Sequence, residues 1–281
     1  MNTRFLPYWL LAPSVIFLCI FFLYPFVAVA VQSFSKDGAW TLEHYDDMVG
    51  HWKFGSTFWT TVLLAAAIVP FQLLMALSMA KLVSGLTTGR DTILYIFAIP
   101  LGISDLAVGI IWLAIFEQSG FLNSMMMSLG IIDQPIILLG HQNKWVIFIA
   151  ILLAELWRAT AIMMVIIVAG MGLIPKEYDE AGEVFGANAW QRFCRISLPL
   201  LRPSLQTALI LRVIAAFEVF AVVLVLAGSN VTVLMSEVQR WAFDLREPGV
   251  AAAIAMIILV ISIAATLVIM RVLRVPKEAQ I

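Results

Sequence analysis

The sequence predicts an all-α membrane protein with six transmembrane helices and one polar cytoplasmic loop between the fourth and the fifth. Of its 281 residues, 62% are hydrophobic and 12% are charged, against roughly 45–50% and 25% in soluble domains. A soluble fold cannot hide that much apolar surface, so lipid is the remaining solvent. Six apolar stretches reach the length of about 20 residues that a helix needs to cross a bilayer. The sequence shows no alternation of apolar and polar residues of the kind that would indicate the strands of a β-barrel.

The six predicted spans follow one another in a single transmembrane domain, residues 1–281. They cover residues 8–32, 58–83, 93–116, 145–171, 204–227 and 248–272. The loops predicted on the outer side are too short to form a separate domain, and the sequence contains no internal repeat.

The charges between the spans predict the orientation. With the N-terminus inside, ten Lys and Arg residues lie on the cytoplasmic side and five on the outer side, in agreement with the positive-inside rule. Both termini are then cytoplasmic. The cytoplasmic set is Arg4, Lys81, Arg90, Lys176, Arg192, Arg195, Arg202, Arg271, Arg274 and Lys277, and the outer set is Lys36, Lys53, Lys144, Arg240 and Arg246.

The remaining composition argues against several classes of function. The formal net charge of −1 gives no reason to expect nucleic-acid binding. The two cysteines are far apart, all three histidines fall in predicted loops, and no cluster has metal-ligand spacing. The chain also has no G-x-x-x-x-G-K-[S/T] phosphate-binding loop. We therefore expect no cofactor and no enzymatic activity in this chain.

The residues of the polar loop, 175–203, predict that it forms a helical hairpin parallel to the membrane. Acids gather near its start and arginines towards its end, which suits the dipoles of helices. Gly186 divides the loop into two short helices, about 176–185 and 187–196. Pro199 and Pro203 are expected to limit the second helix and lead into the fifth span. The charged residues are Glu177, Asp179, Glu180, Glu183, Arg192, Arg195 and Arg202.

Two interpretations of this hairpin are open. It can rest on lipid headgroups as an interfacial helix, although four acids facing an anionic leaflet argue against that. It can instead dock in a groove of a cytoplasmic partner. Trp190, Phe193 and Ile196, spaced by three, give it an apolar side, and Ala181 and Gly182 give its first helix a surface for close approach.

The motifs of the chain resemble those of a family. Glu180-Ala181-Gly182, Gly186 and Ile196-Ser197-Leu198-Pro199 are similar to the E-A-A, G and I-x-L-P signature of the membrane subunits of binding-protein-dependent ABC importers. The resemblance is to their carbohydrate-uptake class, which includes the maltose-type permeases. Gly182 departs from the second alanine of the signature. The stretches LLAPSVIFLCIFFLYP, GRDTILYIFAIP and GFLN also resemble this class.

The resemblance implies a type I ABC importer permease in the plasma membrane of a prokaryote. The hairpin would be a coupling-helix pair in a cleft of a cytoplasmic ATPase, with Glu180 facing a basic group and Gly186 forming the turn. The partners implied are a second permease, usually different, two ATPase subunits that bind ATP and Mg²⁺, and an external solute-binding protein that delivers a sugar. The coupling residues are Glu180, Ala181, Gly182, Gly186, Ile196, Leu198 and Pro199.

Ionisable residues inside membrane spans are costly and mark candidate functional positions. This chain has Asp105, Glu155, Arg158, Arg212 and Glu218. Glu155 and Arg158 are three residues apart and can pair with each other, whereas Arg212 and Glu218 cannot share one helix face. These charges can either fix helix packing or line the substrate path.

Glu218 lies between aromatic residues, a combination that suits sugar binding, because rings stack on the apolar faces of a sugar and a carboxylate accepts hydrogen bonds from its hydroxyls. In maltose-type permeases the substrate site lies in the equivalents of the fourth and fifth spans. The substrate-path candidates are therefore Asp105, Arg158, Thr160, Arg212, Phe217 and Glu218. The same machinery could serve a polyol or a glycerol phosphoester. An ion-coupled secondary transporter is the alternative from another class, but the inverted repeats expected there are absent from the sequence.

Overall fold

The computed structural model describes residues 6–86 and 88–274 and divides the chain into two compact units. The first comprises residues 1–56 and 234–259, and the second comprises residues 57–233 and 260–281. The predicted cytoplasmic cations Arg4 and Lys277 lie outside the described residues. That the whole chain forms one transmembrane domain stays a prediction.

The first unit begins with a long, continuous helical segment that contains the first predicted span. It consists of α1 (Leu6–Leu18), a π-helical turn (Cys19–Leu23) and α2 (Tyr24–Phe34). Pro25 lies two residues after the end of the π-helical turn, in the first turn of α2, where the wider turn before it accommodates a residue that cannot donate a backbone hydrogen bond. Apolar side chains from Tyr8 to Phe26 are exposed, as expected for a helix whose surroundings are lipid.

A tight hairpin and several short helices complete the first unit. Strands β1 (Ser35–Lys36) and β2 (Ala39–Trp40) pair antiparallel. Asp37 and Gly38, between them, have φ of 52° and 82°, the left-handed conformations that a two-residue type I′ turn requires. The other elements are α3 (Glu43–Gly50), α14 (Leu234–Gln239), a π-helical turn (Arg240–Asp244) and the first part of α15 (Pro248–Val272).

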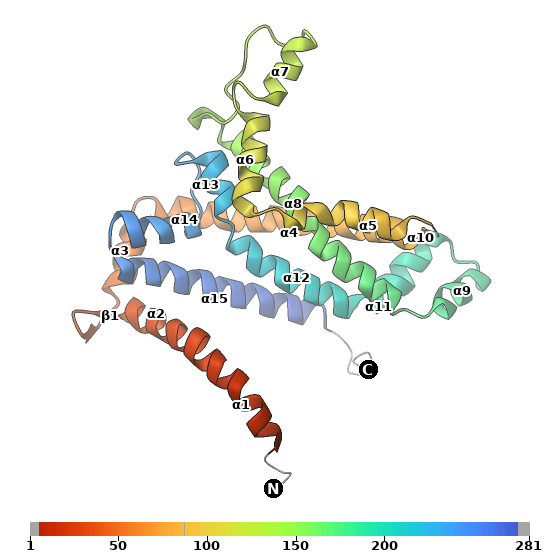
Figure 1. The fold of residues 1–281 in the computed structure, drawn as a ribbon, viewed down its shortest axis with the longest axis horizontal. Helices are drawn as coiled ribbons and strands as arrows, with labels where there is room; N and C mark the ends of the chain where they lie inside the picture. Colours follow the sequence, from red (N-terminus) through yellow and green to blue (C-terminus); the bar gives the residue numbers. More distant parts are fainter. Residues whose placement is uncertain (1–5, 87, 275–281) are drawn as a thin grey trace. The chain divides into compact units, whose positions relative to one another are not determined.

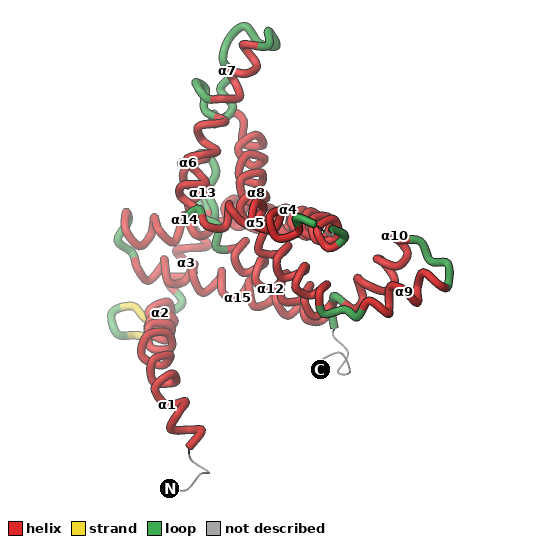
Figure 2. The backbone as a smooth tube through the Cα atoms, turned by 45° about the vertical axis from the view of Figure 1, so that its right-hand side comes forward, coloured by secondary structure: helices red, strands yellow, loops and turns green. Residues whose placement is uncertain are grey.

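The regular elements described in the second unit are all helices (Figure 1). Its long helices are α4 (Phe54–Ser84), α8 (Lys144–Gly172) and α12 (Arg202–Phe217). The first three residues of α4 belong to the first unit, which ends at residue 56. Helix α8 contacts α12, α13, α6 and α5. In both views α9 and α10 lie at the end of this unit far from α13 (Figures 1 and 2). The shorter helices are α5 (Arg90–Ala98), α6 (Asp105–Phe116), α7 (Phe121–Ser128), α9 (Lys176–Val184), α10 (Ala189–Arg192), α11 (Leu198–Leu200) and α13 (Ala221–Ala227).

The helices confirm the predicted all-α membrane fold. Within the described residues, five helices are long and apolar enough to cross a membrane. A bent pair, Ala189–Leu200 with Arg202–Phe217, brings the number to six. The predicted spans 8–32, 58–83, 145–171 and 248–272 each lie inside one of the five.

The third and fifth predicted spans are divided in the structure. In the third, α5 passes into a 3₁₀ turn (Ile99–Gly102) and α6 starts afresh at Asp105. Pro100 and Gly102 break the helix, and the Ser104 hydroxyl accepts a hydrogen bond from the Ala107 N–H to cap α6. In the fifth, α12 ends at Phe217 and α13 begins at Ala221. Hydropathy alone does not show these breaks, because the residues around them stay apolar.

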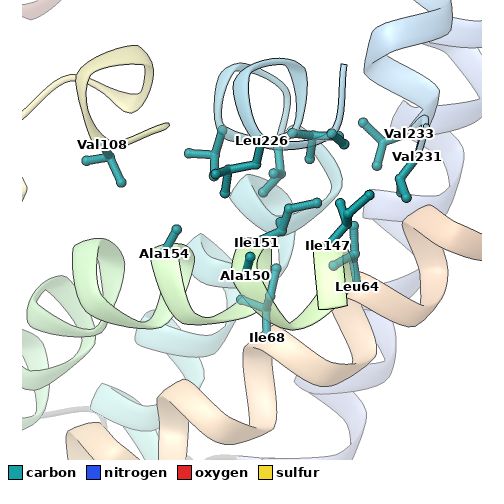
Figure 3. Close-up of a cluster of buried hydrophobic side chains, with 14 residues drawn as sticks. Leu64, Ile68, Val108, Ile147, Ala150, Ile151, Ala154, Leu226, Val231 and Val233 are labelled. Carbon is teal, nitrogen blue, oxygen red and sulfur yellow. The ribbon is translucent and has the colours of Figure 1, made fainter. Parts of the chain in front are cut away.

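Two apolar clusters hold the second unit together. One joins α4, α6, α8 and α13 through Ile68, Val108, Ile151 and Leu226, among others, and Figure 3 shows these side chains converging from separate helices. The other lies towards the ends of α4 and α8 that adjoin the hairpin loop, with Ala76, Met164, Leu205 and Ala208 at its centre. Small residues within both clusters allow close helix approach, a feature of packing in membranes.

Candidate functional site

Four of the five ionisable residues predicted within the spans form one continuous chain of ion pairs in the second unit. Arg158 Nη1 lies 2.9 Å from Asp105 Oδ1, and its Nη2 lies 3.2 Å from Glu155 Oε2. The same Glu155 oxygen is 3.5 Å from Arg212 Nη2. Two arginines thus alternate with two carboxylates, and the four formal charges cancel. The predicted pairing of Glu155 with Arg158 is confirmed.

This charge chain joins three helices, and its two ends differ in exposure. Asp105 is the first residue of α6, Glu155 and Arg158 lie on α8, and Arg212 lies on α12. The Glu155 side chain is 1% exposed and that of Arg212 is 5%, whereas that of Asp105 is 51% exposed. Charges at membrane depth are costly unless they are paired, so the buried end depends most on its partners.

Gln72 of α4 completes the buried end, and the sequence analysis missed it. Its Oε1 accepts a hydrogen bond from Arg212 Nε at 2.8 Å, and its Nε2 donates to the backbone carbonyl of Glu155 at 2.9 Å. Gln72 is completely buried. A search for charged residues overlooks a neutral amide, although a lone Gln in an apolar run is itself a signal of an interhelical hydrogen bond.

The other substrate-path candidates are not members of the charge chain. Thr160 is buried, and its hydroxyl donates to the backbone carbonyl of Leu156 in the preceding turn. Phe217 is buried at the end of α12. Glu218 is exposed in the break that follows and does not continue that helix. The prediction that Arg212 and Glu218 cannot share a helix face assumed one continuous helix, and α12 ends before Glu218.

The polar loop forms the predicted helical hairpin. Gly186 has φ of +79°, a left-handed conformation that favours glycine, and it lies between α9 and α10. The Asn188 and Gln191 side chains each accept a hydrogen bond from the other residue's backbone N–H, at 2.8 Å and 2.9 Å. This capping box satisfies N–H groups at the start of the second helix.

Arg192 ties the two arms of the hairpin together. Its Nε donates to Asp179 Oδ1 at 3.1 Å, its Nη1 donates to the carbonyl of Ala187 at 3.1 Å, and its Nη2 lies 3.6 Å from Glu183 Oε2. The sequence indicated only that acids and arginines suit opposite ends of the loop. The structure shows that Arg192 of the second arm forms ion pairs with acids of the first arm.

The two arms also approach each other closely at Gly182. A Cβ at this position would lie 2.7 Å from Ile196 Cδ1 and 3.2 Å from Arg192 Cδ, closer than carbon atoms approach without a shift. Gly182 is buried, whereas Glu180 and Ala181 are exposed. The prediction of a close-approach surface is thus fulfilled by Gly182, and the missing methyl group lets Ile196 lie against the first arm.

The second helix was expected to end near residue 196, limited by Pro199 and Pro203, and it ends between these two prolines, four residues later than expected. The helical segment runs from Ala189 to Leu200 and bends by 71° into α12, which starts at Arg202. Before Pro199 the chain widens into a π-helical turn (Phe193–Ser197), in which the Leu198 N–H donates to the Phe193 carbonyl. Such a turn accommodates a proline without ending the helix. Pro203 lies in the first turn of α12.

Comparison with known protein families decides what kind of protein carries these features. Residues 72–275 match the family described as binding-protein-dependent transport system inner membrane component. The match spans the charge chain and the hairpin together.

This chain belongs to that family.

Relatives of this permease match it along nearly its whole length. It is 30% identical to the sulfoquinovosyl glycerol transport system permease protein SmoG of Agrobacterium fabrum, over 98% of this chain and 92% of the relative. It is 27% identical to the trehalose/maltose transport system permease protein MalF of Thermococcus litoralis, over 97% of this chain and 95% of the relative.

A solved structure shares the fold of the permease. It is the crystal structure of a bacterial ABC transporter involved in the import of the acidic polysaccharide alginate, with a TM-score of 0.85 and 21% identity, covering 97% of this chain and 96% of that one. The fold is therefore that of an ABC importer permease. Family membership and the apolar helices make this chain a multi-pass membrane protein, a permease rather than an enzyme.

Proposed function

We propose that this permease is the transmembrane subunit of an ATP-driven importer for a sugar or glycoside delivered by an external solute-binding protein. The substrate class is inferred from similar permeases, which are named for the transport of sugars or glycosides. Those for sulfoquinovosyl glycerol, for trehalose and maltose and for arabinooligosaccharides each match at least 93% of this chain. A further relative takes up osmoprotective compounds, which keeps a polyol or a glycerol phosphoester as the second candidate.

The hairpin is the proposed site of coupling to the ATPase. Its tip is apolar and open: Val184 and Phe185 are 85% and 89% exposed, and they directly precede the turn at Gly186. Exposed apolar side chains beside a turn are typical anchors for a partner groove. ATP and Mg²⁺ would be bound by the two ATPase subunits. The positive-inside rule supports a cytoplasmic hairpin and cytoplasmic termini.

The charge chain is the proposed framework of the substrate path. Asp105 is its exposed member, at the break in the third span, and Glu218 is exposed at the break in the fifth. Helix breaks at membrane depth are tolerated where they are buried in protein or line a water-filled cavity. A second permease subunit, which we expect to be a different chain, would complete this path.

Reconstitution tests the proposal. The complete importer, with both permeases, the ATPase and the binding protein, is placed in vesicles, and uptake of the sugar that stabilises the binding protein in a thermal-shift screen is measured. We expect uptake that needs ATP and the binding protein. Uptake of a polyol or glycerol phosphoester instead would overturn the sugar assignment. Uptake by the permeases alone, driven by an ion gradient, would overturn the importer assignment.

A further inference from the structure

A cationic pocket lies where the hairpin meets the ends of α4 and α8, and neither the charge chain nor the coupling surface explains it. Its volume is about 810 Å³. The lining includes four cations, Lys81, Arg90, Lys176 and Arg192, and two carboxylates, Glu177 and Asp179. The lining therefore has an excess of two positive charges.

The cations of this pocket differ in how far their charge is already neutralised. Arg192 is paired with Asp179 and Glu183. Lys81 is held differently: its Nζ lies 5.0 Å from the ring centre of Trp190 and 4.6 Å from that of Phe193. Aromatic faces fix the position of an ammonium group but bring no formal negative charge. Among the described residues, no carboxylate forms an ion pair with Lys81.

Arg90 and Lys176 add two exposed cations on other elements. Arg90 starts α5 and Lys176 starts α9, and in the described part of the chain neither forms an ion pair with a carboxylate. Together with Lys81 on α4, they surround the pocket from three helices. Such an arrangement complements a compact anion with several acceptor oxygens, such as a phosphate group.

The location of the pocket indicates where such a phosphate comes from. Lys81 and Ser84 lie in the last turn of α4, and Gly172 ends α8, so the pocket lies at the boundary where two membrane-crossing helices leave the hydrocarbon. Leu82 and Leu173, neighbours of lining residues in the chain, are 73% and 83% exposed. Exposed apolar residues next in sequence to the lining of a cationic pocket match a ligand with a charged head and an apolar tail.

We propose that this pocket binds the phosphodiester headgroup of an anionic phospholipid. The lipid would contact the hairpin and the ends of α4 and α8 at once, and its occupancy would therefore affect how firmly the hairpin is held against the membrane-crossing helices.

Native mass spectrometry of the purified complete importer tests the proposal. The importer is delipidated in detergent and titrated with phosphatidylglycerol or with phosphatidylcholine. We expect stronger binding of phosphatidylglycerol and weakening of that binding in the double variant Arg90→Gln, Lys176→Gln. Each cation near an anionic lipid contributes about fivefold in affinity, so the pair should contribute roughly twenty-fivefold.

Arg271→Gln is the matched control. It removes an exposed cation from the last turn of α15, outside the pocket, and should leave phosphatidylglycerol binding within about twofold of the unmodified importer. Equal loss in this control and in the double variant would show general charge attraction and overturn the pocket. Equal binding of the two lipids would also overturn it. Displacement of the lipid by inorganic phosphate at millimolar concentration would identify a free-anion site and overturn the lipid assignment.

Discussion

Arg158 Nη1 lies 2.9 Å from Asp105 Oδ1, so the first residue of α6 is tied to the middle of α8. Because the chain breaks just before Asp105, this ion pair joins the residue at which the third span resumes to α8. Through Glu155 the same arginine is linked to Arg212 of α12. A single chain of charges thus orients three helices at membrane depth.

Loss of charge at the two carboxylates of this chain should have unequal effects on stability. Glu155→Gln leaves Arg158 and Arg212 without their shared buried carboxylate, and breaking a buried pair costs about 3–5 kcal/mol. Asp105→Asn removes a half-exposed carboxylate and should cost about 1 kcal/mol or less. Thermal unfolding of the solubilised importer measures both. Equal decreases in Tm would contradict the buried role of Glu155.

Gly182→Ala should loosen the hairpin. The added methyl group would lie 2.7 Å from Ile196 Cδ1, and overpacking of this kind costs about 1–3 kcal/mol. We expect weaker ATPase stimulation by the loaded binding protein. Adding Ile196→Val, which removes Cδ1, should restore it, whereas Leu198→Val added instead should not. A Gly182→Ala variant with full stimulation would show that the arms are not held at this contact.

Gly186 requires a left-handed backbone, and its replacement should separate the ATPase from the permease. With φ of +79°, a conformation that β-branched residues very rarely adopt, Gly186→Val should insert in the membrane but lose the ATPase subunit on co-purification. Gly186→Asn is the control, because Asn tolerates this conformation better than other residues with a Cβ. Normal co-purification of the ATPase with Gly186→Val would contradict docking through this turn.

Glu218→Ala should abolish uptake while assembly survives. Glu218 is exposed at the end of α12 and is no member of the charge chain, so its removal leaves no buried arginine without a partner. Uptake is measured in vesicles, and assembly by co-purification of all subunits. Phe217→Leu, at the buried neighbour, should reduce stability more than transport. Unchanged uptake by Glu218→Ala would remove this residue from the substrate path.

Much of the fold could be predicted from the sequence, because hydropathy reports what surrounds a helix. The span at residues 8–32 needed only its length and its lack of charge. The hairpin was predictable because Gly186 has a local conformational preference that does not depend on distant residues. Pro100 and Gly102 indicate a kink before Asp105 from the sequence alone. The break after Phe217 was not predicted, since the lost backbone hydrogen bonds there are compensated by neighbouring helices that the sequence does not place.

The sequence by itself determined the membrane-spanning class, the predicted orientation, the polar hairpin and the family. These follow from composition and from residues close together in the chain. Only the tertiary structure decided which charges are partners. Asp105 and Glu155 are 50 positions apart in the chain, yet Arg158 bridges them, and Gln72 joins from a fourth helix. The reason is physical: a charge inside a membrane must be compensated, but its partner is selected by how the helices pack and not by their order.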